Sequence, residues 1–364
     1  MKPVVSLLAA VSVLATALAL LQPSLPQPIA VSANTSGLRQ DVLRSVRQQV
    51  TGTLVTAPAH QQVTEPAAVI ESPLPPPVVD GEPPSLPAWT PPSWFPEGAG
   101  DALWVLDGID SPAEVKDRIR GLKSRTAFVY DLDAGRVLLA YGADERRPVA
   151  SLTKMISALA LVSEPDALER EVCLGLTALP DWPGAGSHLR YGRCTTGWDL
   201  LGAALVRSDN GAAMAMPSAA RLPEAPFIAR MNVISRELGM NQSSFVDPSG
   251  IFDDNLSTAR DMTRAVIAVA HHPELAPVAS APYWRVEYHS GRTKKMRSTN
   301  RLLGMRGVEF LAAKTGYTDT ARHCFAAVVR TASGRRLAFT TLGARRGRYR
   351  WSDAKTLLKW AENR

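Results

Sequence analysis

Strand patterns at both ends of the folded part constrain this chain more than any other feature of its sequence. Near the start, "TAFVYDLDAGRVLLAYG" (residues 126–142) holds two apolar runs around Asp133-Ala134-Gly135, which predicts a β-hairpin. Three more strand patterns come late: "EFLAAKTGYT" (309–318), "HCFAAVVRTASG" (323–334) and "RRLAFTTLGAR" (335–345). We therefore expect one sheet whose strands come from both ends of the chain.

Helical patterns fill the middle of the chain and close it. The segment 194–208 starts with Thr196 and Asp199, a plausible capping box. The segment 224–240 has apolar residues at helical spacing, and 257–272 begins with Thr258 and Asp261 as a start signal. A final helix is expected over 352–363. The sequence thus predicts an α/β protein in which helices pack around an antiparallel sheet and form an all-helical subregion.

The N-terminal third does not look like part of that fold. Lys2 precedes an uncharged, small and apolar run from 3 to 21, and "AVSAN" places Val31 and Ala33 at the positions a signal peptidase reads. Residues 1–33 are therefore interpreted as a signal peptide or retained signal anchor, and the protein as exported to the periplasm or cell envelope. Residues 34–100 are Pro-rich and predict an extended linker. The folded domain is expected over 101–364.

Charge and cysteine content narrow the classes of partner. The 41 basic and 34 acidic residues give a formal charge of +7, but no dense basic run with interleaved aromatics appears, which argues against nucleic acid. The chain has no CxxC pair among Cys173, Cys194 and Cys324, so no metal site is expected. Two interpretations stay open: a disulfide between Cys173 and Cys194, or three buried thiols.

Three short motifs carry the chemistry: Ser151-Leu152-Thr153-Lys154, Ser208-Asp209-Asn210 and Lys314-Thr315-Gly316. Each motif alone occurs by chance in many proteins. In this order, and on these predicted elements, they match the triplet of penicillin-binding proteins and β-lactamases.

The spacing of the first motif explains its chemistry. Residues three apart on a helix share a face, so Lys154 can reach the hydroxyl of Ser151 and take its proton. Lysine is a base only when neutral, and burial together with the nearby cation of Lys314 would lower its pKa. The sequence therefore predicts Ser151 as nucleophile and Lys154 as general base, with no cofactor.

The remaining motif residues have predicted supporting roles. Ser208 would relay a proton to the leaving amine, and Asn210 would hold a substrate amide. Lys314 and Thr315 would bind a carboxylate, and Gly316 would leave the strand open for substrate to add as a β-strand. The backbone amides of Ser151 and Tyr317 would form the oxyanion hole.

The residues around these motifs resemble a known family. "SRTAFVYDLDAGRVLLAYGADERRPVASLTKMISALAL", "MNVISRELGMNQSSFVDPSGIFDDNLSTARDM" and "STNRLLG…FLAAKTGYTDTARHCF" are similar to the low-molecular-mass penicillin-binding proteins, the D-alanyl-D-alanine carboxypeptidase family. The resemblance covers about residues 120–364. It implies the penicillin-recognising, β-lactamase/transpeptidase-like fold, an acyl-enzyme on Ser151, peptidoglycan stem peptides as substrate and β-lactams as inhibitors.

Within that family the chain looks most similar to the penicillin-binding protein 7/8 type D,D-endopeptidases, through "DNLSTARDM" and "RHCF". This favours cleavage of peptide cross-links, with trimming of pentapeptide stems as the alternative. One departure is Arg322 after Ala321, where the family usually has glycine. A side chain there is expected to reshape the floor beside the oxyanion hole.

Two further functions compete with a D,D-peptidase. A class A β-lactamase would use a glutamate to activate water, and Glu237 with Asn241 has a suggestive spacing, but its context predicts a structural role. An inactive wall-binding or β-lactam-sensing protein is disfavoured because the catalytic set is intact. His271-His272 is interpreted as a charge complement at a helix end. "GARRGRYR" (343–350) is interpreted as a solvated turn, or as a weak contact for anionic wall polymer.

Overall fold

The computed structural model describes residue 119 and the ranges 121–175 and 186–364. All of these lie within the unit Pro83–Arg364. The predicted signal segment (1–33) and linker (34–100) are outside the described residues. Among the helices that are described, none has the length and apolar character needed to span a bilayer.

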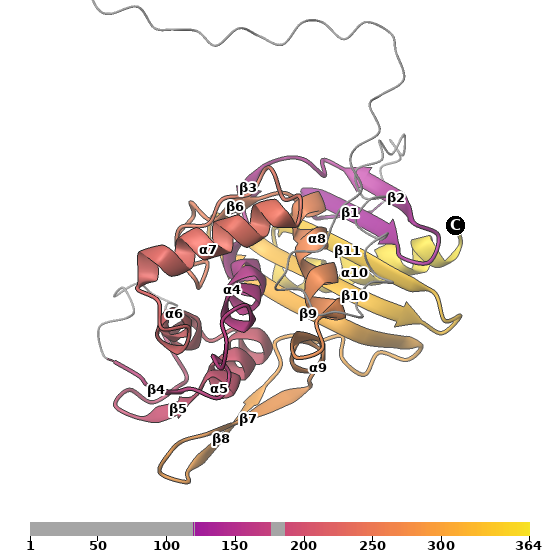
Figure 1. Ribbon diagram of the computed structural model, residues 1–364. Coiled ribbons are helices and arrows are strands. Elements are labelled where there is room, and N and C mark those ends of the chain that lie inside the picture. Colours follow the sequence, from indigo (N-terminus) through magenta and orange to yellow (C-terminus); the bar gives the residue numbers. More distant parts are fainter. Residues whose placement is uncertain (1–118, 120, 176–185) are drawn as a thin grey trace, which may run out of the picture. The chain divides into compact units, whose positions relative to one another are not determined.

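A five-stranded antiparallel sheet forms the centre of the domain, with the order β2-β1-β11-β10-β9 (Figure 1). The predicted hairpin and the three late strands all lie in it, and β1 pairs directly with β11. Both ends of the chain therefore build one sheet, as predicted. The strands are β1 (Thr126–Asp131), β2 (Arg136–Tyr141), β9 (Val308–Thr318), β10 (Arg322–Thr331) and β11 (Arg336–Ala344).

Helices cover both faces of this sheet. Along β1, Phe128 and Tyr130 join one buried cluster, whereas Val129 joins a second, because successive side chains of a strand point to opposite faces. The first cluster includes residues of α8 (Ala259–His271), and the second includes residues of α10 (Gly347–Glu362). With both faces covered, every residue of β1 is buried.

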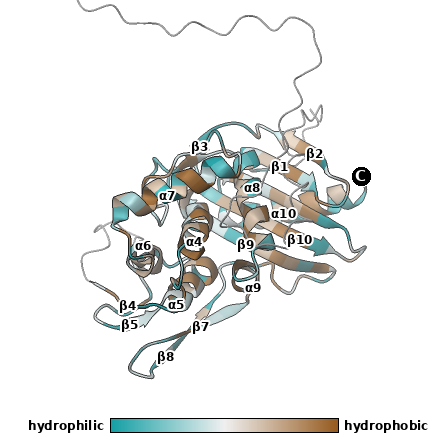
Figure 2. Ribbon diagram, in the orientation of Figure 1, coloured by the Kyte–Doolittle hydropathy of each residue, from teal (hydrophilic) through white to brown (hydrophobic). Residues whose placement is uncertain are grey.

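The predicted all-helical region lies beside the sheet, around α4 (Lys154–Val162). Figure 2 shows α4 as mostly apolar, and all of its residues except Val162 are buried. It contacts α6, α7 and α8. The other helical elements are the 3₁₀ turn η4 (Ala150–Thr153), α5 (Gly197–Gly202), the π-helical turn η5 (Ala203–Arg207), α6 (Asn210–Ala219), α7 (Glu224–Glu237) and α9 (Leu275–Ala279).

One of the two predicted helix starts is made differently from the expectation. Thr258 Oγ1 accepts from the amide of Asp261 at 3.0 Å, as predicted. Thr196 Oγ1 likewise accepts from the amide of Asp199 at 3.3 Å. The carboxylate of Asp199 instead accepts from Trp284 Nε1 at 2.9 Å, so it joins α5 to β7 (Tyr283–Glu287) and does not complete a capping box.

Several short strand pairs were not predicted. The hairpin of β7 with β8 (Thr293–Arg297) buries only Val286 and Met296 of its ten residues. Such strands are mostly polar, so they give no apolar run or clear alternation in the sequence. The other pairs are β3 (Arg147–Pro148) with β6 (Leu256–Ser257), and β4 (Glu171–Cys173) with β5 (Cys194–Thr196).

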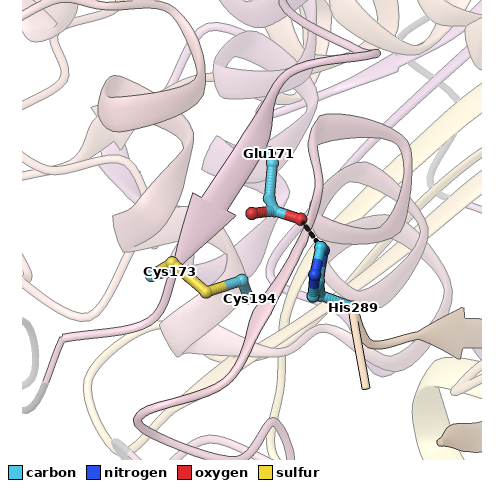
Figure 3. Close-up of a disulfide and its surroundings, with 4 residues drawn as sticks. All are labelled: Glu171, Cys173, Cys194 and His289. Atoms are coloured by element: carbon cyan, nitrogen blue, oxygen red, sulfur yellow. Dashed lines mark hydrogen bonds and ion pairs between the residues drawn. A yellow bond between two sulfur atoms is a disulfide. The ribbon is translucent and has the colours of Figure 1, made fainter. Parts of the chain in front are cut away.

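Cys173 and Cys194 face each other across β4 and β5 and form a disulfide. Beside it, His289 Nδ1 lies 2.6 Å from Glu171 Oε2 (Figure 3). Closing a loop of this length stabilises the fold by about 3 kcal/mol in the chain-entropy description. Cys324 is a buried thiol, and burial raises its pKa to about 11.

The two histidines at the end of α8 are not the charge complement that we predicted. His272 is only 3% exposed, and burial lowers its pKa to about 4. Burial also lowers the pKa of His271, whose Nδ1 lies 2.9 Å from Ile267 O. Both rings are neutral near pH 7, so they pack at the helix end without adding charge.

His272 should make folding sensitive to acid. An unfolded chain protonates this ring near pH 6.5 and the folded chain only near pH 4, so stability falls as the pH drops through this window. At pH 5 the loss from His272 is expected to be about 2 kcal/mol. Urea unfolding of wild type and His272→Gln at pH 7 and pH 5 measures it. Equal losses in the two proteins would contradict the assignment.

Candidate active site

Ser151, the predicted nucleophile, lies in a tight turn at the start of α4. Strand β3 leads into η4, and Ala150, the residue before Ser151, has φ = 50°. Non-glycine residues adopt this left-handed region at a cost, and residues strained in this way are often found at functional sites. Ser151 thus belongs to a 3₁₀ turn that continues into the helix, and it remains partly exposed while Lys154 is fully buried.

Lys154 joins three segments through its ammonium group. Its Nζ donates to Ser151 Oγ at 2.9 Å, to Asn210 Oδ1 at 2.7 Å and to the carbonyl of Ser249 at 2.5 Å. Ser151, Lys154 and Asn210, which the sequence proposed as partners from two different motifs, therefore lie in one hydrogen-bonded cluster.

Burial lowers the pKa of Lys154 to about 7, although the carboxylates of Asp247 and Asp209 act in the opposite direction. Burial also holds the pKa of Lys314 well below its usual value, and the neighbouring charges of Lys154 and Arg350 add to this effect. A lysine with a pKa near 7 is substantially neutral at physiological pH, so it can accept a proton.

A turn at residues 247–250 presents the third acceptor to Lys154. Asp247 Oδ1 accepts from the amides of Ser249 at 2.6 Å and Gly250 at 2.8 Å, which fixes the Ser249 carbonyl. Gly250 has φ = 77°, and a Cβ on it would lie 2.1 Å from the carbonyl oxygen of Ala150. The sequence did not predict that Asp247 and Ser249 belong to the site, although the run Asp-Pro-Ser-Gly at 247–250 does predict a turn.

The second motif connects η5 to α6. Ser208 has φ = 63° and reverses the chain, and Asp209 caps α6 by accepting from the amide of Ala212 at 2.9 Å. Asn210 is then the first residue of α6 and points at Lys154. Ser208 Oγ accepts from Lys314 Nζ at 2.7 Å. The predicted relay serine is thus hydrogen-bonded to the lysine of the third motif.

The third motif lies near the end of β9, where it runs past η4. Lys314 is buried, and Thr315 Oγ1 lies 2.6 Å from Thr299 Oγ1. A Cβ on Gly316 would lie 2.8 Å from the carbonyl oxygen of Val149. Glycine is therefore needed here so that β9 can approach the segment before Ser151. This reason differs from the predicted one, which was room for substrate.

Tyr317 is 49% exposed at the open side of this strand. Its ring stacks on His323 with centroids 4.4 Å apart, and its hydroxyl donates to Asp319 Oδ1 at 2.7 Å. The Tyr317 side chain is therefore engaged by His323 and Asp319, so the group of Tyr317 considered for the site is its backbone amide.

Part of the basic segment 343–350 is not the solvated turn that the sequence suggested. Helix α10 begins at Gly347, and Arg350 is half-buried. Arg350 Nη1 donates to the carbonyls of Gly316 at 3.0 Å and Cys324 at 3.3 Å, so it braces β9 against β10 beside the site. An arginine in a basic run gives no sequence signal for such a contact.

Arg322 and Glu237 are both exposed. Arg322 lies at the start of β10 opposite Thr318 and has φ = 60°, a conformation that glycine adopts more easily. The departure from the family pattern thus concerns the backbone, and the side chain points to solvent. Glu237 is the last residue of α7. Asn241, which the β-lactamase interpretation pairs with it, is also exposed, and this agrees with a structural role for Glu237.

Comparison with known proteins agrees with this geometry. Residues 113–346, more than half of the chain, match the peptidase S11 family, described as D-alanyl-D-alanine carboxypeptidase. A D-alanyl-D-alanine endopeptidase of Pseudomonas aeruginosa is 30% identical over 66% of this chain and 78% of its own length. A second endopeptidase of that name, from Escherichia coli, is 28% identical over the same shares.

Carboxypeptidases and solved structures match as well. A D-alanyl-D-alanine carboxypeptidase of Bacillus subtilis is 25% identical over 66% of this chain and 62% of its own length. The crystal structure of a Mycobacterium tuberculosis D-alanyl-D-alanine carboxypeptidase superposes with a TM-score of 0.62 at 25% identity, covering 69% of this chain and 95% of that one. The Streptomyces K15 DD-transpeptidase, at 22% identity and a TM-score of 0.60, shares the fold. With its penicillin-recognising fold, its three motifs in one cluster and its match to the family model, this chain belongs to the S11 family of D-alanyl-D-alanine peptidases.

Proposed function

We propose that the protein is a D-alanyl-D-alanine endopeptidase of peptidoglycan that works through an acyl-enzyme on Ser151. The observation that carries the catalytic assignment is the contact of Ser151 Oγ with a fully buried lysine whose pKa lies near 7. The endopeptidase assignment is supported by the names of the relatives from Pseudomonas aeruginosa and Escherichia coli.

Acylation begins with proton transfer between groups already in contact. Neutral Lys154 takes the Ser151 hydroxyl proton over 2.9 Å while Oγ attacks the D-alanyl carbonyl carbon. The carbonyl oxygen becomes an oxyanion, which the amides of Ser151 and Tyr317 are proposed to stabilise. The hydrogen bonds from Lys154 to Asn210 and Ser249 fix Nζ, so little reorganisation is needed.

The leaving amine needs a proton as its C–N bond breaks. Ser208 is proposed to relay to that nitrogen the proton that Lys154 took from Ser151, which leaves Lys154 neutral again before deacylation. Lys314, whose Nζ donates to Ser208 Oγ at 2.7 Å, would hold the relay hydroxyl in place. Lys314 and Thr315 are also proposed to bind a carboxylate of the substrate. In deacylation, water replaces the amine, and Lys154 again takes the proton.

Acylation should increase with pH through neutrality. Burial lowers the pKa of Lys154 to about 7, and only the neutral amine acts as base, so the rate rises as protons are removed. We expect the second-order rate of acylation by benzylpenicillin to rise about tenfold per pH unit below pH 7 and to level off above it. Stopped-flow or quenched labelling between pH 5 and 9 measures this. A rate that is flat from pH 5 to 8 would contradict a titrating base.

The bond that is cut can be determined with two defined substrates. An endopeptidase converts a cross-linked dimeric muropeptide to monomers, whereas a carboxypeptidase releases D-alanine from a pentapeptide monomer. We expect the dimer to be cleaved and the pentapeptide to react more slowly, with products identified by mass. Release of D-alanine with the dimer intact would assign carboxypeptidase activity instead.

Adding benzylpenicillin as a third substrate distinguishes a D,D-peptidase from a β-lactamase and from an inactive binding protein. Ser151→Ala is the matched control, since it removes only the nucleophilic hydroxyl. A class A β-lactamase would turn over penicillin rapidly without acting on either muropeptide, and an inactive binding protein would act on none of the three.

Export to the periplasm or cell envelope, with anchoring through residues 1–33, is part of the proposal. Fractionation of cells expressing the full chain tests it.

A further inference from the structure

A strongly basic cavity of about 770 Å³ lies apart from the motif residues, where the start of β1, the β9–β10 turn and the start of α10 meet. None of the eight predicted site residues lines it. We propose that this cavity, here called the basic pocket, binds phosphate groups of a multiply charged envelope ligand. Six of its lining residues are cations: Lys123, Arg125, Arg147, Arg322, Arg345 and Arg346.

The positive charge of the basic pocket is only partly neutralised. Glu145 Oε1 lies 2.7 Å from Arg125 Nε and 2.8 Å from Arg147 Nη1, so one carboxylate serves two guanidinium groups. Within the described part of the chain, the other four cations make no ion pair, and no carboxylate is among the lining residues. Cations gathered in one cavity repel one another, and an anionic ligand would relieve this repulsion.

Two further features point toward an anion. Arg147 Nε is buried and has no hydrogen-bond partner within the described residues, although its side chain lines the pocket. The N-terminal end of α10 also faces it, because the N-cap residue Arg346 and Tyr349 of the first turn are lining residues. The amide of Tyr349 donates to the Arg346 carbonyl at 2.9 Å, but no side chain caps this sixteen-residue helix, so its dipole and the amides before Tyr349 can act on an anion.

The number of guanidinium groups favours phosphate over a single carboxylate. Each arginine presents a fork that binds two oxygens of a phosphate, and a phosphate has more acceptor oxygens and more charge than a carboxylate. The cavity volume exceeds that of one phosphate ion and admits a phosphorylated sugar or a lipid head group. Such a site would hold the enzyme at a polyanionic surface without occupying its catalytic cluster, so the inference rests on the proposed export to the envelope but not on the proposed reaction.

Binding of inorganic pyrophosphate to the full chain tests the proposal by titration calorimetry. The pocket variant is Arg345→Gln with Arg346→Gln, both exposed residues outside the catalytic cluster. The matched control is Arg190→Gln with Arg193→Gln, which removes the same charge from a different basic surface. We expect pyrophosphate to bind wild type and the control alike and the pocket variant at least about tenfold more weakly. Labelling by fluorescent penicillin, unchanged in all three, reports correct folding.

Vesicle binding then separates the two sources of phosphate. Sedimentation with phosphatidylglycerol vesicles, but not phosphatidylcholine vesicles, that is lost in the pocket variant would assign a lipid head group. Pyrophosphate binding without vesicle binding would assign a soluble or glycan-borne phosphate. The proposal is overturned if wild type binds neither probe, if both double variants weaken equally, or if a phosphate-free muropeptide dimer displaces pyrophosphate competitively.

Discussion

Replacing Lys154 with arginine is expected to slow acylation of Ser151 by benzylpenicillin by about 10²–10⁴-fold. Arginine keeps the positive charge and can still donate hydrogen bonds, but it does not lose its proton at accessible pH. In the wild type, burial brings the pKa of Lys154 to about 7, which makes the neutral amine available 2.9 Å from Ser151 Oγ. The variant would lose that base while retaining charge, and quenched labelling with fluorescent penicillin measures the rate.

Two control variants distinguish removal of the catalytic base from disruption of the folded active site. Ser151→Ala should give no covalent label at all, because the hydroxyl that forms the ester is absent. Lys314→Arg should keep part of the activity, since the proposed role of Lys314 is to bind a substrate carboxylate and to donate a hydrogen bond to Ser208, and arginine can do both. Thermal unfolding shows whether Lys154→Arg still folds. A folded Lys154→Arg protein that acylates near the wild-type rate would refute proton transfer by this lysine.

Gly250→Ala is expected to destabilise the protein by about 3 kcal/mol or more and to disable acylation. The added Cβ would lie 2.1 Å from the Ala150 carbonyl oxygen and 2.8 Å from Thr153 Oγ1, and φ = 77° disfavours any side chain. The turn that delivers the Ser249 carbonyl to Lys154 must therefore move, and so must the segment before Ser151. Urea unfolding and penicillin labelling measure the two effects.

Gly334 offers a matched control for this substitution. It has φ = 88°, but a Cβ there would meet nothing within 4 Å. Gly334→Ala thus reports the cost of the left-handed backbone alone, about 1 kcal/mol, and should leave acylation unchanged. If the two variants lose equal stability, the close contact of Gly250 with Ala150 is not what makes glycine necessary.

Most of the architecture could be predicted because its signals are local. The β1–β2 hairpin and β9–β11 are apolar runs separated by turn residues. Helix α7 carries Phe227, Met231 and Ile234 on its buried face, and Leu238 is buried just after its end, as the spacing predicts. The three motifs could be found for a similar reason, since each is a short run of fixed residue types. Their convergence around Lys154 could be expected only from the triplet as a whole.

The parts that were missed depend on contacts between distant segments. Arg350 of α10 donates to the Gly316 carbonyl, but arginine is a residue type usually found on the surface. Ser249 accepts from Lys154 through its backbone carbonyl, so its side-chain type gives no signal of this contact. His272 was misinterpreted because its charge state depends on burial, which the end of a helix does not reveal. The capping box predicted at Thr196 does not form because the Asp199 carboxylate accepts hydrogen bonds from Trp284 and Glu287 of β7 instead.

The sheet built from both ends of the chain has a consequence for the order in which the protein matures. The amide of Lys123, just before β1, bonds to Asp353, which follows it by 230 residues, and β1 pairs with β11. The ribosome must therefore make all of the chain between β1 and β11 before these two strands can pair, and such distant pairing is slow. Until then, the edge of the β1–β2 hairpin remains open to wrong partners. Lys314 also lies far beyond Ser151 in the sequence, so a nascent chain cannot assemble the catalytic cluster before β9 has been made.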